Sequence, residues 1–160
     1  MIKIGKSKRN IFKTFPNNET SIDVDFIKYA MSKIEPDEKG LNKIEIMWKY
    51  EDDSEIFKLL LLKESIMKNF ENGKPYQLIL NVPYLPYSRM DRDEEGSIQP
   101  FSLNILYDLI KGFDVIKTKD IHSNAIFERE DSERIQNEDI VPKMLIKAIL
   151  KNNDKDGVNI

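Results

Sequence analysis

Asn81-Val-Pro-Tyr-Leu-Pro-Tyr-Ser-Arg-Met-Asp-Arg-Asp-Glu94 is the stretch of this sequence that decides the expected fold. It follows the apolar run 76–80, which predicts a buried strand, and it precedes the amphipathic segment 101–110, which predicts a helix. An open α/β sheet places its ligand site in such a loop, at the carboxyl end of a strand. We therefore expect this loop to belong to the functional site.

Strand and helix patterns alternate on both sides of this loop. We expect strands at 20–26, 43–50, 76–82 and 114–121, helices at 56–70, 101–110 and 141–150, a polar loop at 123–139 and the start of a further strand at 157–160. In the helix 101–110, the residues expected to face inward are Leu103, Leu106, Leu109 and Ile110. This order predicts right-handed crossovers and an α/β fold with a doubly wound, mainly parallel sheet.

Composition narrows the class of protein and of site. The 160 residues are 40% hydrophobic and 33% charged, which is typical of a soluble domain, and the net charge of -3 gives no electrostatic reason to expect nucleic acid as the main partner. The longest uninterrupted apolar run, 59–62, is too short to span a bilayer. The chain has no cysteine and one histidine, which excludes disulfides, thiolate metal sites and a zinc site built on several imidazoles. A bound metal is therefore expected to be a hard cation such as Mg²⁺.

Three polar stretches could carry chemistry. The first, 87–94, places Arg89 beside carboxylates, and arginine offers a planar fork for phosphate. The second, 119–123, holds His122 just past the end of a predicted strand, and the third, Phe15-Pro-Asn-Asn-Glu19, has the residues of a tight turn. Taken singly, each has a plain alternative, namely a solvated loop, a structural histidine or a surface turn. No Walker-type or Gly-x-Gly-x-x-Gly nucleotide loop is present.

In their order and spacing, these stretches resemble the ribose-phosphate pyrophosphokinase family, also called phosphoribosyl-pyrophosphate synthetase. Residues 83–92, Pro-Tyr-Leu-Pro-Tyr-Ser-Arg-Met-Asp-Arg, are similar to the family's Pro-Tyr-x-x-Tyr-x-Arg-Gln-Asp-Arg/Lys signature. Residues 99–102, Gln-Pro-Phe-Ser, resemble its Pro-Ile-Ser segment. Residues 120–123, Asp-Ile-His-Ser, resemble its Asp-Leu-His-Ala/Ser segment, and 15–19 resemble its Phe-Ser/Pro-Asp/Asn-Gly-Glu segment.

The resemblance implies an activity and a set of binding residues. The family transfers the β,γ-diphosphoryl group of Mg-ATP to the 1-hydroxyl of ribose 5-phosphate. The implied residues are Phe15, Asn17 and Glu19 in an adenine site that is often completed across a subunit interface, Arg89, Met90 and Asp91 at the ATP site, and His122 as a ligand of Mg²⁺. Met90 stands where glutamine is usual, and Asn18 stands where glycine is common. The short N-terminal region and the Tyr-Ser-Arg-Met-Asp variant are more similar to divergent phage-type members.

The resemblance covers residues 15–123, which correspond to one half of a two-domain enzyme. The family's fold is phosphoribosyltransferase type I-like, and the ribose 5-phosphate loop and catalytic loop of its second half do not occur in this sequence. The resemblance therefore implies an ATP-side domain over 1–150 and a connector over 151–160. It assigns no catalytic residue to this chain. We expect little synthase activity from this chain alone.

The expected partners and location follow from the same resemblance. The chain is expected to form a homo-oligomer or to pair with a C-terminal half. Neither nucleic acid nor a membrane is expected as a partner. The location expected is the cytoplasm, or the host cytoplasm if a phage encodes the chain. The alternative functions are a non-catalytic regulatory homologue that associates with a synthetase and a generic oligomerisation domain.

Overall fold

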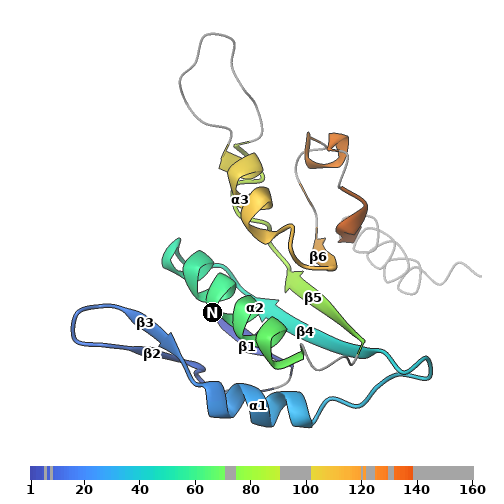
Figure 1. The fold of residues 1–160 in the computed structure, drawn as a ribbon. Coiled ribbons are helices and arrows are strands. Elements are labelled where there is room, and N and C mark those ends of the chain that lie inside the picture. The colour runs from blue at the N-terminus through green and yellow to red at the C-terminus, as the bar shows by residue number, and fades with distance from the viewer. Residues whose placement is uncertain are drawn as a thin grey trace, which may run out of the picture.

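The computed structural model describes residues 1–5, 7, 9–70, 75–90, 102–119, 121, 125–129 and 132–138. In chain order the elements are β1 (Ile2–Ile4), β2 (Phe12–Thr14), β3 (Thr20–Ile22), α1 (Val24–Ser32), β4 (Asn42–Trp48), α2 (Ser54–Phe70), β5 (Tyr76–Val82), α3 (Ser102–Ile110), β6 (Val115–Lys119), the short 3-10 turns Ala125–Glu128 and Ser132–Arg134, and β7 (Ile135–Glu138). Figure 1 shows their arrangement.

A five-stranded sheet in the order β1-β4-β5-β6-β7 forms the centre of the fold. Strands β4 to β7 pair in parallel, and β1 adds an antiparallel edge to β4. Helix α2 connects β4 to β5 and helix α3 connects β5 to β6, as parallel neighbours require. The predicted α/β fold with a mainly parallel sheet is confirmed.

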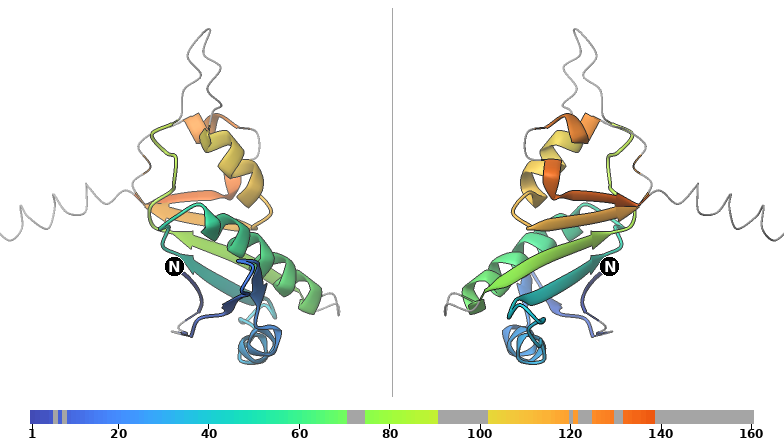
Figure 2. Two further views of the ribbon diagram at one scale, coloured as in Figure 1. Left: turned by 90° about the vertical axis from the view of Figure 1, so that its left-hand side faces the viewer. Right: turned by 90° about the vertical axis from the view of Figure 1, so that its right-hand side faces the viewer.

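The main hydrophobic core lies between the sheet and the helices. Every second residue of β4 is buried, with Ile44, Ile46 and Trp48 fully buried, while Lys43, Glu45 and Met47 on the other face are exposed. Figure 2 shows α2 and α3 on the same side of the sheet. In β5, Leu78, Ile79 and Leu80 are all buried, so this strand is buried on both faces, as its continuous apolar run predicts.

The start of helix α1 differs from the prediction of a strand over 20–26. The strand β3 ends at Ile22, and Asp23 is the N-cap of α1, whose Oδ1 accepts a hydrogen bond of 3.1 Å from the backbone N–H of Phe26. A capping aspartate satisfies a backbone donor that a helix leaves unpaired. The alternating pattern of 20–26 is therefore divided between two elements. Residues 20–22 form the short strand β3, and the capping hydrogen bond of Asp23 starts the first helical turn of α1 directly after it.

Two further predictions are wrong in part. Residues 123–139 are not only a loop, because they contain the two 3-10 turns and the edge strand β7, which pairs with β6 and buries Ile135. Leu109 in α3 is exposed, and Tyr107 takes the inward position instead. The predicted helix 141–150 and strand 157–160 lie outside the described residues, so the boundary between 1–150 and 151–160 stays a prediction. Among the described helices, none is long and apolar enough to cross a membrane.

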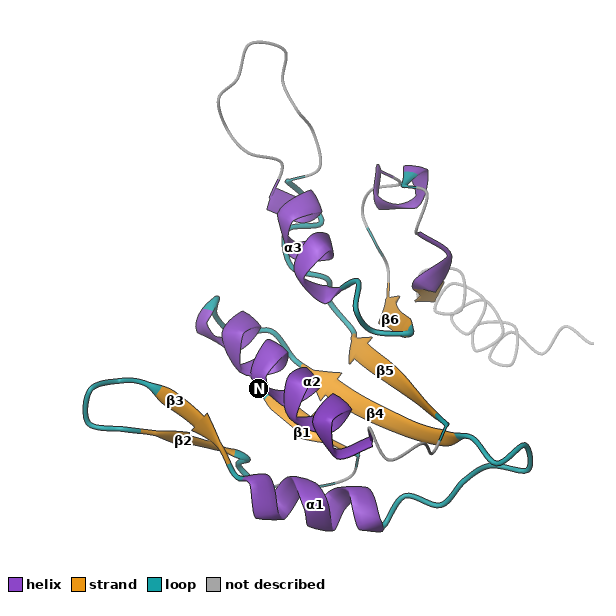
Figure 3. Cartoon of the chain, viewed as in Figure 1, coloured by secondary structure: helices purple, strands orange, loops and turns teal. Residues whose placement is uncertain are grey.

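A hairpin formed by β2 and β3 stands apart from the five-stranded sheet, as Figure 3 shows. The register pairs Phe12 with Ile22 and Thr14 with Thr20, which leaves residues 15–19 as the hairpin tip. Phe12 and Ile22 pack against the main core, so the base of the hairpin is anchored while its tip extends outward.

Candidate functional site

The arginine loop, residues 83–90, follows β5 at the carboxyl end of this central parallel strand. The backbone N–H of Met90 donates to the carbonyl of Tyr87 over 2.8 Å, which closes a turn around Arg89. Leu85 and Ser88 are buried, whereas Arg89 and Met90 are exposed. The loop therefore has an anchored side and presents the guanidinium of Arg89 toward solvent, where an anion could reach it.

Tyr87 anchors the loop to the end of the neighbouring strand β4. Its hydroxyl donates a hydrogen bond to Oδ1 of Asp53, and the hydroxyl of Tyr50 donates to the same oxygen over 2.6 Å. The Tyr50 ring makes an edge-to-face contact with each of the Tyr87 and Trp48 rings, at centroid distances of 6.4 and 5.7 Å. These contacts join the loop after β5 to the loop after β4.

The electrostatics of this cluster match its hydrogen bonds. The hydrogen bonds from Tyr50 and then from Tyr87 lower the pKa of Asp53. The hydrogen bond to Asp53 is in turn the largest cause of the raised pKa of Tyr50 and of the raised pKa of Tyr87. At neutral pH the cluster therefore holds one carboxylate and two protonated phenols, which is the state in which both hydrogen bonds form.

The loop also contacts the next strand and the next helix. The backbone N–H of Lys119, the last residue of β6, donates to the carbonyl of Pro83 over 3.1 Å. The N–H of Leu103 in α3 donates to the carbonyl of Met90 over 3.4 Å. The arginine loop is thus held by contacts with the loop after β4, with strand β6 and with helix α3. Asp91 and His122 are predicted site residues that lie outside the described residues.

The hairpin tip has the predicted tight turn. The N–H of Phe15 donates to the carbonyl of Glu19 and the N–H of Asn18 to that of Phe15, both over 2.9 Å, and Oδ1 of Asn17 accepts from the N–H of Glu19 over 3.2 Å. Asn18 has φ of 65°, the left-handed conformation that asparagine tolerates. The side chains of Phe15, Asn17 and Glu19 are exposed.

The structure does not bring the hairpin tip and the arginine loop together within one chain. In both Figure 1 and Figure 2 the tip lies away from the loop that follows β5. Sequence reasoning also missed Tyr50 and Asp53, because it placed Tyr50 at the end of the strand 43–50 and gave no part in a site to the residues between that strand and the helix 56–70. The pair of adjacent aspartates, Asp52 and Asp53, was the available signal for a further role. One aspartate is enough to cap the helix, and Asp52 already accepts a hydrogen bond from the N–H of Ser54 over 2.9 Å.

A cavity of about 400 Å³ lies on the exposed face of the sheet, at the carboxyl ends of β5, β6 and β7. Its lining includes Asn81, Pro83, Lys117, Lys119 and Gln136. The ammonium of Lys117 lies 3.8 Å from a carboxylate oxygen of Glu45, so this cation is partly neutralised. Through Pro83, the cavity adjoins the arginine loop.

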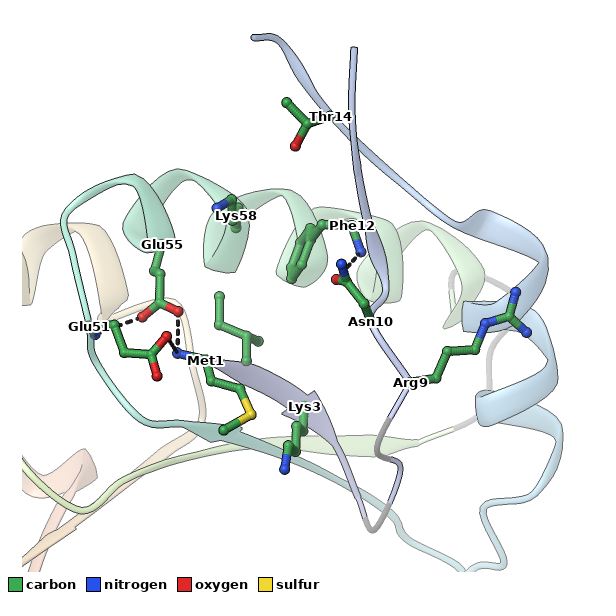
Figure 4. A pocket seen from close by; sticks show the side chains of 10 residues that line it. Met1, Lys3, Arg9, Asn10, Phe12, Thr14, Glu51, Glu55 and Lys58 are labelled. Atoms are coloured by element: carbon green, nitrogen blue, oxygen red, sulfur yellow. Dashed lines mark hydrogen bonds and ion pairs between the residues drawn. The ribbon is translucent and has the colours of Figure 1, made fainter. Parts of the chain in front are cut away.

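A second cavity, of about 270 Å³, lies between β1, β2 and α2 (Figure 4). Beside it, the Glu55 carboxylate contacts the α-amino group of Met1 and accepts hydrogen bonds from Nε1 of Trp48 over 3.1 Å and from the N–H of Glu51 over 3.0 Å. None of the residues predicted for the ATP site lines this cavity. Because its central carboxylate is occupied by protein donors, we assign this region a structural role.

The described residues provide no group of three or more carboxylate or imidazole side chains placed to hold a metal ion. Asp53, the carboxylate that contacts the arginine loop, is engaged by two tyrosine hydroxyls. The described part of the chain therefore does not form a magnesium cage of its own. The metal role predicted for His122 stays a prediction.

Comparisons with known proteins support the fold. No family model and no curated protein matches this sequence. Among solved structures, phosphoribosylpyrophosphate synthetase from Mycobacterium smegmatis is similar, with a TM-score of 0.57 and 17% sequence identity over 89% of this chain. The chain spans 43% of the length of that synthetase chain. The similarity places this chain in the same α/β fold.

Proposed function

We propose that this chain forms the ATP-binding half of a ribose-phosphate pyrophosphokinase, with ribose 5-phosphate bound by a second half. The observation that carries the proposal is the position of the Tyr87-Ser-Arg89 motif. It lies at the carboxyl end of central strand β5, in a chain whose fold is similar to a phosphoribosylpyrophosphate synthetase. Open parallel sheets bind their ligands at this edge.

In this proposal, Arg89 binds the polyphosphate of Mg-ATP. Diphosphoryl transfer depends on positioning and charge neutralisation more than on covalent chemistry, so a fixed guanidinium is a suitable group. The exposed side chain of Arg89 forms no ion pair within the described residues, which leaves it available to a ligand. Asp91 and His122 would complete this side of the site together with the magnesium ion that accompanies ATP.

The hairpin tip would serve the adenine site of a neighbouring chain. Phe15 offers an exposed ring, 52% accessible, and Asn17 and Glu19 offer hydrogen-bonding groups beside it. Because the tip lies away from the arginine loop of its own chain, the two predicted parts of one site would come from two subunits. This arrangement supports a homo-oligomer as the active form.

The test is calorimetric titration with Mg-ATP of the wild type, Arg89→Ala and the control Arg134→Ala. A charge-assisted hydrogen bond contributes about 1.5–3 kcal/mol, so Arg89→Ala should weaken affinity by about 10-fold to 150-fold. Arg134 also carries one positive charge, but it donates to the backbone carbonyl of Lys111, and its replacement should leave affinity unchanged. Equal affinity of wild type and Arg89→Ala would contradict the proposal.

A second candidate function is a non-catalytic homologue that associates with a synthetase. The observation that favours it is Met90, an exposed apolar side chain where the family carries a polar glutamine. This candidate predicts that the pure chain does not bind Mg-ATP and that it co-purifies with a complete synthetase subunit. Binding of Mg-ATP that depends on Arg89 would exclude it.

A further inference from the structure

Tyr50, Asp53 and Tyr87 form a cluster that we call the tyrosine clamp. The two hydroxyl groups converge on a single oxygen, Oδ1 of Asp53, although Asp53 and Tyr87 are 34 residues apart in the chain. Tyr50 and Asp53 lie between β4 and α2, and Tyr87 lies in the arginine loop between β5 and α3. The clamp is therefore a side-chain link between two loops at the same edge of the sheet.

The backbone conformation of Tyr87 indicates that the clamp holds this residue in an unfavourable geometry. Its φ of 62° is in the left-handed region, which is unfavourable for a residue with a bulky side chain. Such a conformation persists where surrounding contacts hold it, and it occurs often at ligand sites. The contacts available are the hydrogen bond to Asp53, the edge-to-face ring contact with Tyr50 and the turn closed by the N–H of Met90.

The conformation of Tyr87 determines where Arg89 lies. The Met90 N–H donates to the Tyr87 carbonyl, so Arg89 lies inside a turn whose first residue is Tyr87. Ser88, between the two, is buried, and its backbone N–H donates to the carbonyl of Leu85 over 3.4 Å. If Tyr87 relaxed to a right-handed or extended conformation, the direction of the following residues would change, and the guanidinium would move with them.

We infer that Tyr50 and Asp53 are positioning residues, which hold Tyr87 and thereby direct Arg89 toward an anionic polyphosphate ligand. This inference rests on the proposed function, because it takes Arg89 as the phosphate contact. Neither Tyr50 nor Asp53 belongs to the motifs that carry the family resemblance. The alternative is a clamp that stabilises the fold without any effect on ligand binding.

The first experiment uses Tyr50→Phe and Tyr87→Phe, which remove one hydroxyl each and keep the ring. Tyr84→Phe is the matched control, because Tyr84 lies in the same loop, is 51% exposed and has no side-chain hydrogen bond in the described part of the chain. Trypsin cleavage after Arg89, measured without ligand by mass spectrometry, reports how firmly the loop is held. Loss of one hydrogen bond should speed cleavage about twofold to tenfold in the clamp variants and not in the control.

The second experiment measures the Mg-ATP affinity of Tyr87→Phe in two backgrounds, with Arg89 present and with Arg89→Ala. A positioning role predicts a loss of about twofold to tenfold when Arg89 is present and no further loss in the Arg89→Ala background. A purely structural role predicts that Tyr87→Phe causes no affinity loss in either background. That result, or an equal loss in both backgrounds, would overturn the inference. Unchanged cleavage after Arg89 would overturn it as well.

The outcomes separate this inference from the proposed function. If wild type and Arg89→Ala bind Mg-ATP equally, Arg89 is not a phosphate contact, and both the proposed function and the inference are wrong. If Arg89→Ala weakens binding while the clamp variants match Tyr84→Phe in cleavage and affinity, only the inference is wrong. Faster cleavage together with an affinity loss that requires Arg89 would support both.

Discussion

The hairpin tip and the arginine loop are both predicted parts of an ATP site, yet they are held in different ways. The turn of the tip is made by hydrogen bonds among residues 15–19, and its side chains are exposed. The arginine loop buries Leu85 and Ser88 and contacts β6, α3 and the loop after β4. Both contain one non-glycine residue with positive φ, Asn18 in the tip and Tyr87 in the loop.

This difference has consequences for how each region can work. A locally determined turn keeps its shape wherever the hairpin carries it, which suits a part that would enter the site of a neighbouring subunit. A loop fixed by distant contacts keeps its position relative to the sheet, which suits a group that, in the proposed function, would meet phosphate at a defined place. Mutations should therefore affect the two regions unequally, and the following predictions test this.

The largest expected effect comes from Leu85→Ala in the arginine loop. Leu85 is 2% exposed, and removal of a buried leucine side chain costs about 2–5 kcal/mol of unfolding free energy. Phe15→Ala in the hairpin tip should change this free energy by less than about 0.5 kcal/mol, because the Phe15 ring is 52% exposed. Urea denaturation of both variants measures the contrast, and equal losses would show that the tip is packed in solution.

An intermediate effect is expected at Asn18. Alanine is less tolerant of a φ of 65°, so Asn18→Ala should destabilise the hairpin by roughly 1–2 kcal/mol, whereas Asn18→Gly should not. Since the turn is local, the change should be seen as faster hydrogen exchange of the β2 and β3 amides. A comparable loss of protection in the β5 amides would contradict the local character of the tip.

The smallest effect is expected from acid, and it should act on the arginine loop. Because the pKa of Asp53 is lowered in the folded state, its ionised form contributes stability above its ordinary pKa of about 4, and this contribution is lost as pH falls through the lowered value. The difference in urea midpoint between wild type and Asp53→Asn should thus be present at pH 7 and shrink below about pH 4.

Glu38→Gln is a suitable control for the acid experiment. Glu38 is exposed and has no ion pair with another described residue. The urea midpoint of Glu38→Gln should follow that of the wild type over the whole pH range of the experiment. A difference between wild type and Asp53→Asn that stayed constant from pH 7 to pH 3 would show that ionised Asp53 does not stabilise the clamp.

The amino-acid sequence by itself determined the elements with strong apolar periodicity. Strand β4, helix α2 and strand β5 lie where their apolar patterns predict them, and the turn at residues 15–19 forms with Asn18 in the left-handed conformation. The place of the arginine loop also follows from the order of strand, loop and helix. These features depend on burial period and on local φ and ψ preferences, which neighbouring residues encode.

Only the tertiary structure decided the features that depend on distant partners. Strand β7 forms because β6 offers a parallel edge to a segment that is polar by itself, and Asp53 becomes part of the site because Tyr87, 34 residues away, reaches it. The separation of the hairpin tip from the arginine loop is likewise a property of the folded chain. No local pattern specifies which strands become neighbours, and the positions of these side chains in space follow from that pairing.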